Sequence, residues 1–156
     1  MRHHHKSRAL ACALLAACAA AFAFGAVGSL AQVGAEQNAA EFVSVAELKE
    51  KLAKNEPVTL IDLRSANVFA SSDGKIAGAV HVKERRLRAR LAQPPLRDLP
   101  RDAEVVTYCA CPNDEAAVRA AQTLSSAGFT RVRVLKGGWR AWLDARAPVE
   151  PKPKGQ

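Results

Sequence analysis

The sequence predicts an α/β fold in which a mostly parallel sheet is covered by helices on both faces. Strand-length segments rich in Val, Leu and Ile occur at residues 58–61, 105–108 and 132–135, and helical patterns lie between them. Runs that are apolar almost throughout are typical of strands buried on both faces. Their alternation with helices favours a parallel sheet. The 156 residues leave room for one such domain.

The first elements of the domain are a helix, a strand and a short helix. Residues 44–47 form a capping box, which predicts a helix with Leu48 and Leu52 on one face. The strand over 58–61 follows, and a short helix is expected at 66–70. This part of the chain therefore supplies one central strand with helices before and after it.

The middle of the domain is more polar. Residues 76–82 form a third apolar segment, in which Gly78 permits close approach of another backbone. Residues 83–93 predict a basic helix with Leu87 and Leu91 facing the core. The arginines on its other face are typical of a solvated surface.

The last part of the domain follows the central strand at 105–108. A helix is predicted over 115–127, with a glycine at its end, and the last strand follows at 132–135. A glycine turn then leads into a short helix. We expect Trp139 and Trp142 on that helix to be core anchors.

The N-terminus has the pattern of an export signal. Residues 1–8 are basic, residues 9–31 carry no charge, and Ser29–Ala31 fits a small-x-small cleavage site before a polar linker. The predicted organisation is a signal peptide or N-terminal membrane anchor (1–31), a linker (32–41), the folded domain (42–150) and an extended tail (151–156).

Two alternatives to a cleaved signal remain open. If the apolar run is not cut, it is long enough to span a bilayer and would tether the domain. The segment Leu15–Cys18 also resembles a lipobox. All three readings predict a periplasmic or other extracytoplasmic domain, which contacts a membrane only if the N-terminal segment stays attached.

Charge and cysteine content narrow the function classes. The formal charge of +8 falls to +5 when the leader cations Arg2, Lys6 and Arg8 are set aside, and no nucleic-acid motif is present, so we expect no nucleic-acid partner. Only Cys109 and Cys111 lie in the domain, which argues for reactive rather than structural thiols in an oxidising compartment. We expect no metal and no cofactor, because tetrahedral sites need three or four ligands.

Cys109 is the leading candidate for a catalytic residue. It directly follows the central strand and precedes a helix, and ligands of parallel sheets collect at that edge. Loop N–H groups and the positive end of the helix would stabilise a thiolate there, which makes the cysteine a nucleophile.

Five fragments have the order and spacing of a known family: Asp62–Leu63–Arg64, Ile76–Ala77–Gly78–Ala79, Tyr108–Cys109, Ala127–Gly128–Phe129 and the run Leu135–Trp142. Together they resemble the single-domain rhodaneses over residues 42–150. The resemblance implies a three-layer fold with a five-stranded, mostly parallel sheet. It also implies that Cys109 carries sulfur as a persulfide, cradled by the backbone of Ala110, Cys111, Pro112, Asn113 and Asp114.

The loop CACPNDE departs from the common family pattern. Cys111 is an additional thiol, which we expect to act as a resolving thiol; Pro112 lacks an N–H; and Asp114 stands where many members have Arg. The acidic residue argues against thiosulfate as donor, although carboxylates also favour the first turn of a helix. We do not expect a phosphatase, because Glu115 stands where a related phosphatase architecture has the Arg that binds phosphate.

Three further residues have mainly structural readings. Asp62 and Arg64 are expected to pair at a strand end, with a place at the pocket rim as the alternative. His81 lies alone in an apolar segment, which is typical of a structural histidine.

The sequence thus predicts an exported, monomeric sulfurtransferase that takes sulfane sulfur from a small donor and passes it to a thiol or protein acceptor. Two alternatives of other classes remain: a thiol-disulfide redox protein that uses the CxC pair, and a binding module without catalysis.

Overall fold

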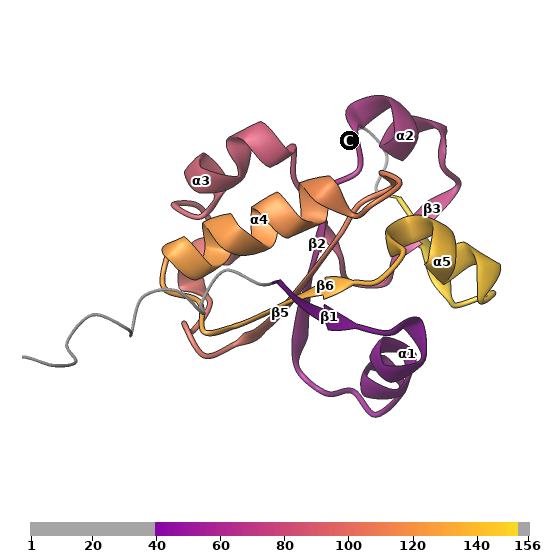
Figure 1. The fold of residues 1–156 in the computed structure, drawn as a ribbon, viewed down its shortest axis with the longest axis horizontal. Coiled ribbons are helices and arrows are strands. Elements are labelled where there is room, and N and C mark those ends of the chain that lie inside the picture. The colour runs from indigo at the N-terminus through magenta and orange to yellow at the C-terminus, as the bar shows by residue number, and fades with distance from the viewer. Residues whose placement is uncertain (1–39, 153–156) are drawn as a thin grey trace, which may run out of the picture. The chain divides into compact units, whose positions relative to one another are not determined.

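The computed structural model describes residues 40–152, so the predicted leader, the linker up to residue 39 and the end of the tail lie outside the described residues. In the described part, five strands form one parallel sheet in the order β1-β6-β5-β2-β4 (Figure 1). These strands are β1 (Glu41–Val43), β2 (Val58–Asp62), β4 (Val80–His81), β5 (Glu104–Tyr108) and β6 (Arg131–Leu135). The α/β class and the parallel sheet are confirmed.

Helices cover both faces of the sheet. They are α1 (Val45–Ala53), α2 (Ala66–Ser71), α3 (Leu87–Arg90), α4 (Glu115–Ser126) and α5 (Gly138–Asp144), with short 3₁₀ turns η1 (Glu84–Arg86) and η2 (Leu96–Asp98). Figure 1 shows α3 and α4 on one face and α1 and α5 on the other. Side chains alternate along the central strands: Ile61 and Val105 pack in the layer of α4, whereas Leu60 and Val106 pack in the layer of α1 and α5.

Local sequence explains where the helices begin and end. The Ser44 hydroxyl accepts the Glu47 N–H at 3.1 Å, as the capping pattern predicts for α1. The Ser65 hydroxyl likewise accepts the Val68 N–H and opens α2. Gly128, at φ +93°, follows the end of α4 in a backbone conformation that favours glycine.

The basic segment over 83–93 differs from the single helix that its pattern predicts. It divides into η1 and the four-residue α3, and its last N–H groups bond three or four residues back. Leu87 is buried, but Leu91 is only partly buried. Because only one leucine packs fully against the core, tertiary packing stabilises a single helical turn here.

The apolar segment over 76–82 also divides between two sheets. Ile76 ends β3 (Gly74–Ile76), which pairs antiparallel with β7 (Val149–Pro151), whereas Val80 begins β4 in the main sheet. Pro151, assigned by its sequence to an extended tail, is therefore the last residue of a paired strand. The close approach expected at Gly78 falls instead at Gly74, where an added Cβ would lie 2.6 Å from the Glu150 carbonyl oxygen.

Candidate active site

Cys109 lies at the carboxyl edge of the sheet, directly after the central strand β5, as its sequence position predicts. Its carbonyl accepts the Trp139 N–H at 2.7 Å, so the start of α5 lies against the cysteine loop. A Cβ on Gly138 would collide with the same carbonyl. Gly138 and Trp139 are thus part of the site's framework, which the sequence indicated only through the glycine pair before the tryptophan.

Cys109 and Cys111 are joined in a disulfide, with their Cα atoms 5.8 Å apart. The Cys111 N–H donates to Cys109 Sγ at 3.4 Å, and the Ala116 N–H in the first turn of α4 donates to Cys111 Sγ at 3.4 Å. The described state is therefore the oxidised form of the pair. The sequence alone does not determine whether this bond forms.

The predicted cradle residues do not share one environment. Ala110, Pro112 and Asn113 are exposed, whereas Asp114 is only 6% exposed. Of the loop N–H groups, that of Cys111 points to the Cys109 sulfur and that of Asp114 bonds to the Cys111 carbonyl at 3.3 Å. Among the described contacts, the Cys109 sulfur therefore accepts one loop N–H, while three of the loop residues face solvent.

Asp114 does not act as the helix-end carboxylate that its position suggests. It is the N-cap residue of α4, at φ +55°, yet its side chain makes no capping hydrogen bond there. Instead Oδ2 accepts the Gly137 N–H at 2.8 Å, at the start of α5. Asp114 thus ties the cysteine loop to the neighbouring helix, while Glu115 takes the expected place in the first turn of α4.

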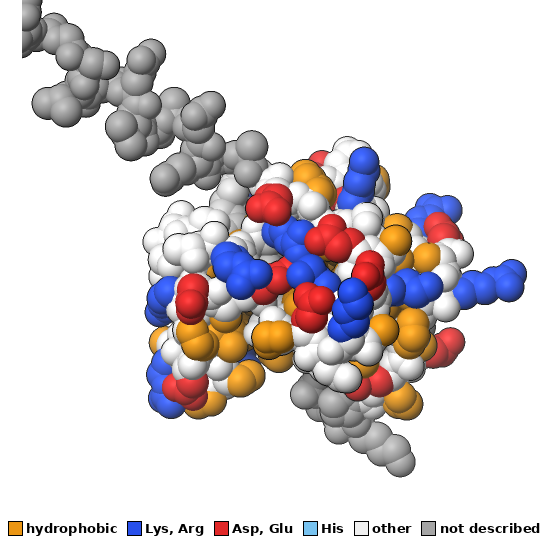
Figure 2. Space-filling model, turned by 90° about the horizontal axis from the view of Figure 1, so that it is seen from below, with side chains coloured by type: hydrophobic (Ala, Val, Ile, Leu, Met, Phe, Trp, Pro, Cys, Tyr) orange, Lys and Arg blue, Asp and Glu red, His pale blue; other side chains and the backbone are white. Residues whose placement is uncertain are grey.

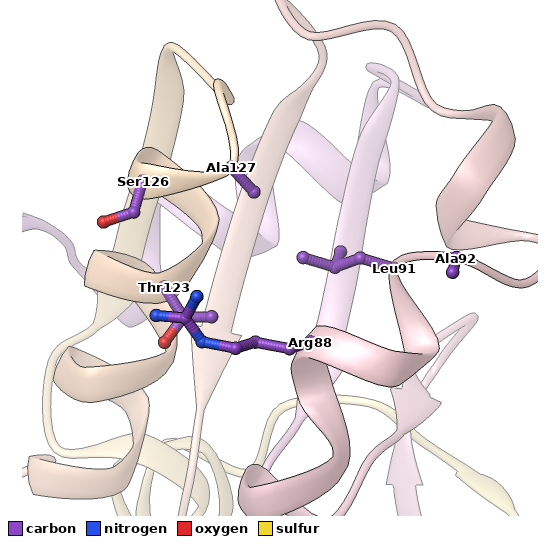
Figure 3. A pocket seen from close by; sticks show the side chains of 6 residues that line it. All are labelled: Arg88, Leu91, Ala92, Thr123, Ser126 and Ala127. Atoms are coloured by element: carbon purple, nitrogen blue, oxygen red, sulfur yellow. The ribbon is translucent and has the colours of Figure 1, made fainter.

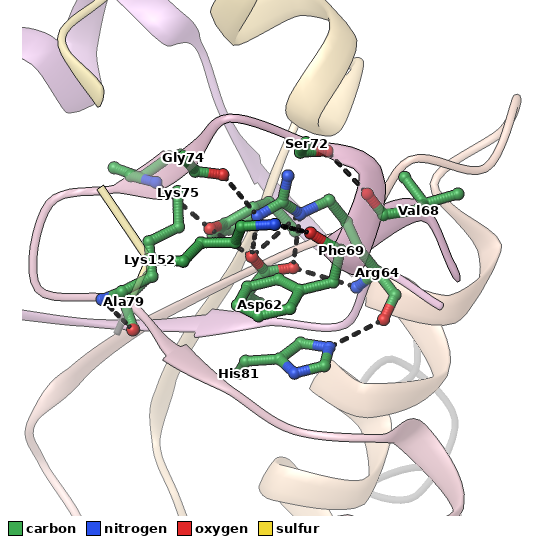
Figure 4. Close-up of polar contacts among 12 residues, drawn as sticks. Asp62, Arg64, Val68, Phe69, Ser72, Gly74, Lys75, Ala79, His81 and Lys152 are labelled. Atoms are coloured by element: carbon green, nitrogen blue, oxygen red, sulfur yellow. Dashed lines mark hydrogen bonds and ion pairs between the residues drawn. The ribbon is translucent and has the colours of Figure 1, made fainter. Parts of the chain in front are cut away.

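Asp62 and Arg64 form a buried ion pair beneath the loop. Arg64 Nη2 lies 2.6 Å from Asp62 Oδ2 (Figure 4). The Tyr108 hydroxyl donates to the same oxygen at 2.8 Å. Both charged residues are at most 1% exposed, so the alternative that placed them at a pocket rim is wrong. Burial of a charge is costly unless the charge is paired, and here Asp62 and Arg64 pair with each other.

Aromatic rings enclose the same guanidinium. The Arg64 Cζ atom lies 4.0 Å from the Trp139 ring centroid and 5.0 Å from that of Phe69. His81 stacks on Phe69 with centroids 3.8 Å apart, and its Nε2 lies 3.0 Å from the Arg64 carbonyl. His81 thus has the structural role that its sequence context predicts.

Tyr108 keeps its proton because of where it lies. Burial raises the pKa of its hydroxyl far above the usual 10.0, and the Asp62 charge and hydrogen bond raise it further, against a smaller opposing effect of Arg64. The phenol therefore remains a hydrogen-bond donor to Asp62 at all ordinary pH values.

A separate pocket of about 320 Å³ lies between α3 and the C-terminal half of α4 (Figure 3). Its lining residues are Arg88, Leu91, Ala92, Thr123, Ser126 and Ala127. The cysteines adjoin the other end of α4, and a helix rises 1.5 Å per residue, which separates the two places by roughly 15 Å. The pocket is therefore not the thiol site.

Residues 40–152 contain neither a metal-binding cluster nor a membrane-spanning helix. That part of the chain contains no group of three or more His, Cys, Asp or Glu side chains placed to hold a metal ion. None of its helices has the length and apolarity needed to cross a membrane.

The curated proteins that match this chain in part include two sulfurtransferases. Over 79 residues the chain is 39% identical to the thiosulfate sulfurtransferase YnjE of Escherichia coli. The matched stretch covers 48% of this chain but only 17% of that protein. Over 102 residues it is 29% identical to a sulfurtransferase of Allochromatium vinosum, covering 65% of this chain and 87% of that protein.

Solved structures agree on the fold. The Alr3790 protein from Anabaena sp. superposes with a TM-score of 0.60 at 32% identity, over 70% of this chain and 82% of that one. The human single-domain sulfurtransferase TSTD1 gives a TM-score of 0.57 at 28% identity, over 68% and 97% of the two chains. Residues 44–145 match the rhodanese-like domain, and the chain belongs to that family.

Proposed function

We propose that this protein is a sulfurtransferase that carries a sulfane sulfur as a persulfide on Cys109. The observation that carries the proposal is the position of Cys109, directly after the central strand and beside the loop that opens α4. Sulfurtransferase relatives of the same family support this assignment.

In the proposed reaction the site must stabilise a negatively charged outer sulfur on Cys109. A reduced Cys109 attacks the outer sulfur of a donor, and the donor's remainder leaves with the electron pair of the broken bond. The terminal sulfur then sits above the loop, where backbone N–H groups and the first turn of α4 favour negative charge. No general base is needed, because the thiolate itself is the nucleophile.

We propose a persulfide of a small thiol, rather than thiosulfate, as the preferred donor. A loop arginine would clamp a doubly charged donor, and this loop has Asp114 at that position, turned inward to Gly137. The acceptor is proposed to be a thiol, either small or on a protein.

Mass mapping of the loop peptide tests the proposal. The reduced chain is treated with glutathione persulfide or with thiosulfate, desalted and digested with trypsin, which releases both loop cysteines on the peptide 102–119. In the Cys111→Ser variant, which cannot close the loop disulfide, we expect one added sulfur with the persulfide and less with thiosulfate, and in Cys109→Ser we expect none. If Cys111→Ser accepts sulfur from neither donor, the proposal fails.

A second function, thiol-disulfide exchange, is favoured by the Cys109–Cys111 bond itself. The reduction potential of the pair discriminates: an unreactive pair sits below about −300 mV, and an oxidant well above it. A binding module without catalysis remains as the third possibility, and it requires that Cys109 resist alkylation at neutral pH in the reduced protein.

We also propose that the domain is exported and acts as a monomer. The basic start, the uncharged run over 9–31 and the site Ser29–Ala31 support export. N-terminal sequencing of cell fractions is expected to find Gln32 as the first residue in the periplasm. An intact Met1 in the membrane fraction would replace the cleaved form by the anchored one. Sedimentation tests the oligomeric state.

A further inference from the structure

The two loop sulfurs differ in their access to solvent. Cys109 is 1% exposed and packs in the apolar layer between β5 and α4, together with Ala117. Cys111 is only partly buried at the edge of that layer. A molecule that approaches the disulfide from solvent therefore meets Cys111 first.

The two sulfurs also differ in their hydrogen bonds. Cys111 Sγ accepts the N–H of Ala116, which lies in the first turn of α4 and has no partner within the helix. The positive end of the twelve-residue α4 thus acts on Cys111. The sequence position predicts this stabilisation for Cys109 instead, but the Cys109 sulfur accepts only the Cys111 N–H among the described contacts.

We propose that Cys111 is a second catalytic residue, whose thiol reduces the Cys109 persulfide so that the outer sulfur leaves as sulfide. A small external thiol then attacks Cys111 and returns the protein to its reduced form. This rests on the proposed persulfide at Cys109. The activity would be a thiol-dependent reduction of sulfane sulfur, in addition to its transfer.

The first step takes place within the loop. The Cys111 thiolate attacks Cys109 Sγ of the persulfide; a Cys109–Cys111 bond forms, and the bond to the outer sulfur breaks. The outer sulfur leaves as hydrosulfide with the electron pair of the broken bond. Two thiols are oxidised to a disulfide and the sulfane sulfur is reduced by two electrons, so no further oxidant is needed.

The second step reopens the disulfide. An external thiolate attacks Cys111 Sγ, the accessible sulfur, and Cys109 leaves as a thiolate that takes a proton or accepts the next sulfur. A second external thiolate then attacks the small-molecule sulfur of this mixed disulfide. Cys111 leaves as a thiolate, and the two external thiols depart joined in a symmetric disulfide. In sum, one sulfane sulfur and two thiols give one sulfide and one small-molecule disulfide.

Sulfide release tests the first step and separates it from the proposed function. The reduced full chain is loaded with one equivalent of glutathione persulfide and desalted at once. Wild type is expected to release one sulfide per chain and to yield a loop peptide two hydrogens lighter than the dithiol. Cys111→Ser is expected to keep one extra sulfur and to release no sulfide until a thiol is added.

The outcomes are distinct. If Cys111→Ser takes up no sulfur, the persulfide function itself fails. If Cys111→Ser takes up sulfur but wild type keeps its extra sulfur equally long, the function stands and the resolving role of Cys111 is wrong. Peptide mapping keeps Cys12 and Cys18 of the leader out of the measurement.

Mixed-disulfide formation tests the point of entry. Oxidised glutathione is added to Cys109→Ser and to Cys111→Ser, each with one loop thiol. We expect the remaining Cys111 to form the mixed disulfide at least about tenfold faster than the remaining Cys109. In denaturant the two variants should react alike, which shows that the fold makes the difference. Equal rates in the folded proteins, or a faster Cys109, overturn the proposal.

Discussion

The sheet carries a charged cluster at each edge, and the two are built in opposite ways. At the amino edge, Glu104 at the start of β5 contacts Lys51 at 3.2 Å, Arg131 at 3.0 Å and Arg133. Figure 2 shows acidic and basic side chains interleaved on the molecule's surface as seen from below. At the carboxyl edge, a single pair, Asp62 and Arg64, is closed off beneath the cysteine loop.

The difference lies in how many partners each charge keeps if one is lost. Glu104 has three cations, one of them, Arg131, well exposed, so water and the remaining partners can compensate. Asp62 has one cation and one hydroxyl, and no solvent reaches either charge. The edge that holds the candidate site thus has no alternative partner for its buried charges, whereas the opposite edge has several.

The largest effect is expected from Arg64→Met, which leaves the Asp62 carboxylate buried without its cation. The free energy of unfolding should fall by about 3–5 kcal/mol. The matched change at the other edge, Arg133→Met, should cost about 1 kcal/mol, since Glu104 keeps two cations. Urea unfolding followed by tryptophan fluorescence measures both.

If Arg64→Met does not fold, the double variant with Asp62→Asn keeps the comparison testable, because it removes the uncompensated charge as well. We expect that variant to recover part of the loss. Equal costs for Arg64→Met and Arg133→Met would contradict the difference between the edges.

The second effect tests how closely the carboxyl edge is packed. Gly138→Ala places a Cβ against the Cys109 carbonyl at a backbone φ of +51°, and should cost about 3 kcal/mol from strain and displacement together. Gly78 has a φ of +74°, but nothing lies within 4 Å of the added carbon. Gly78→Ala should therefore cost only the backbone strain, about 1 kcal/mol. Thermal unfolding compares the two; a Gly78→Ala loss as large as that of Gly138→Ala would show that packing contributes nothing.

The third effect concerns acid. Burial alone would raise the pKa of Glu104, but hydrogen bonds from Arg133 and Lys51 and their charges outweigh it and hold that pKa below its usual 4.5. A lowered pKa contributes stability above the unfolded value, and this contribution is lost as the pH falls through the folded value. Glu104→Gln should lower the free energy of unfolding by about 1 kcal/mol at neutral pH. It should also make the stability of the protein fall less steeply as the pH is lowered.

Glu84→Gln serves as the control for that prediction. The pKa of Glu84 is lowered by its hydrogen bond with Arg119, a pair that is much more open to solvent. It should flatten the acid limb of a pH series of urea midpoints less than Glu104→Gln does. The opposite order would mean that the amino-edge cluster is not the acid-sensitive one.

The smallest effect concerns alkali and the other edge. Because the pKa of Tyr108 is raised in the folded state, its contribution is complete below the unfolded value of 10 and is lost as the pH rises above it. Tyr108 is the only tyrosine, so tyrosinate absorbance reports it alone. We expect this absorbance to appear only together with unfolding.

Tyr108→Phe provides the matched variant, with an expected cost of about 1 kcal/mol for the lost hydrogen bond to Asp62. Its stability should depend less on pH in the alkaline range than that of wild type. Tyrosinate forming in the folded wild-type protein would show that the carboxyl edge is open to solvent after all.

Elements with strong local signals could be predicted from the sequence. The capping serine before α1 and the glycine after α4 mark their ends in the structure as they do in the chain. The continuous apolar strands β2 and β5 take the centre of the sheet, as burial on both faces requires. The place of Cys109 follows from that order.

Features that depend on distant partners could not be predicted. The carboxylate of Asp114 serves Gly137 in another helix, and nothing near residue 114 encodes this. Pairing of β3 with β7 likewise joins segments far apart in sequence. The access and hydrogen bonds that distinguish Cys111 from Cys109 arise only when α4 is in place against the loop.

Strand order has a consequence for how the protein is made. β1, the first strand, pairs only with β6, which is synthesised near the end of the domain, and β3 waits for β7. During synthesis both cysteines emerge before either partner strand exists. Sheet closure, and with it the burial of Cys109, is therefore a late event, and in newly made chains both thiols are exposed before the fold gives them different environments.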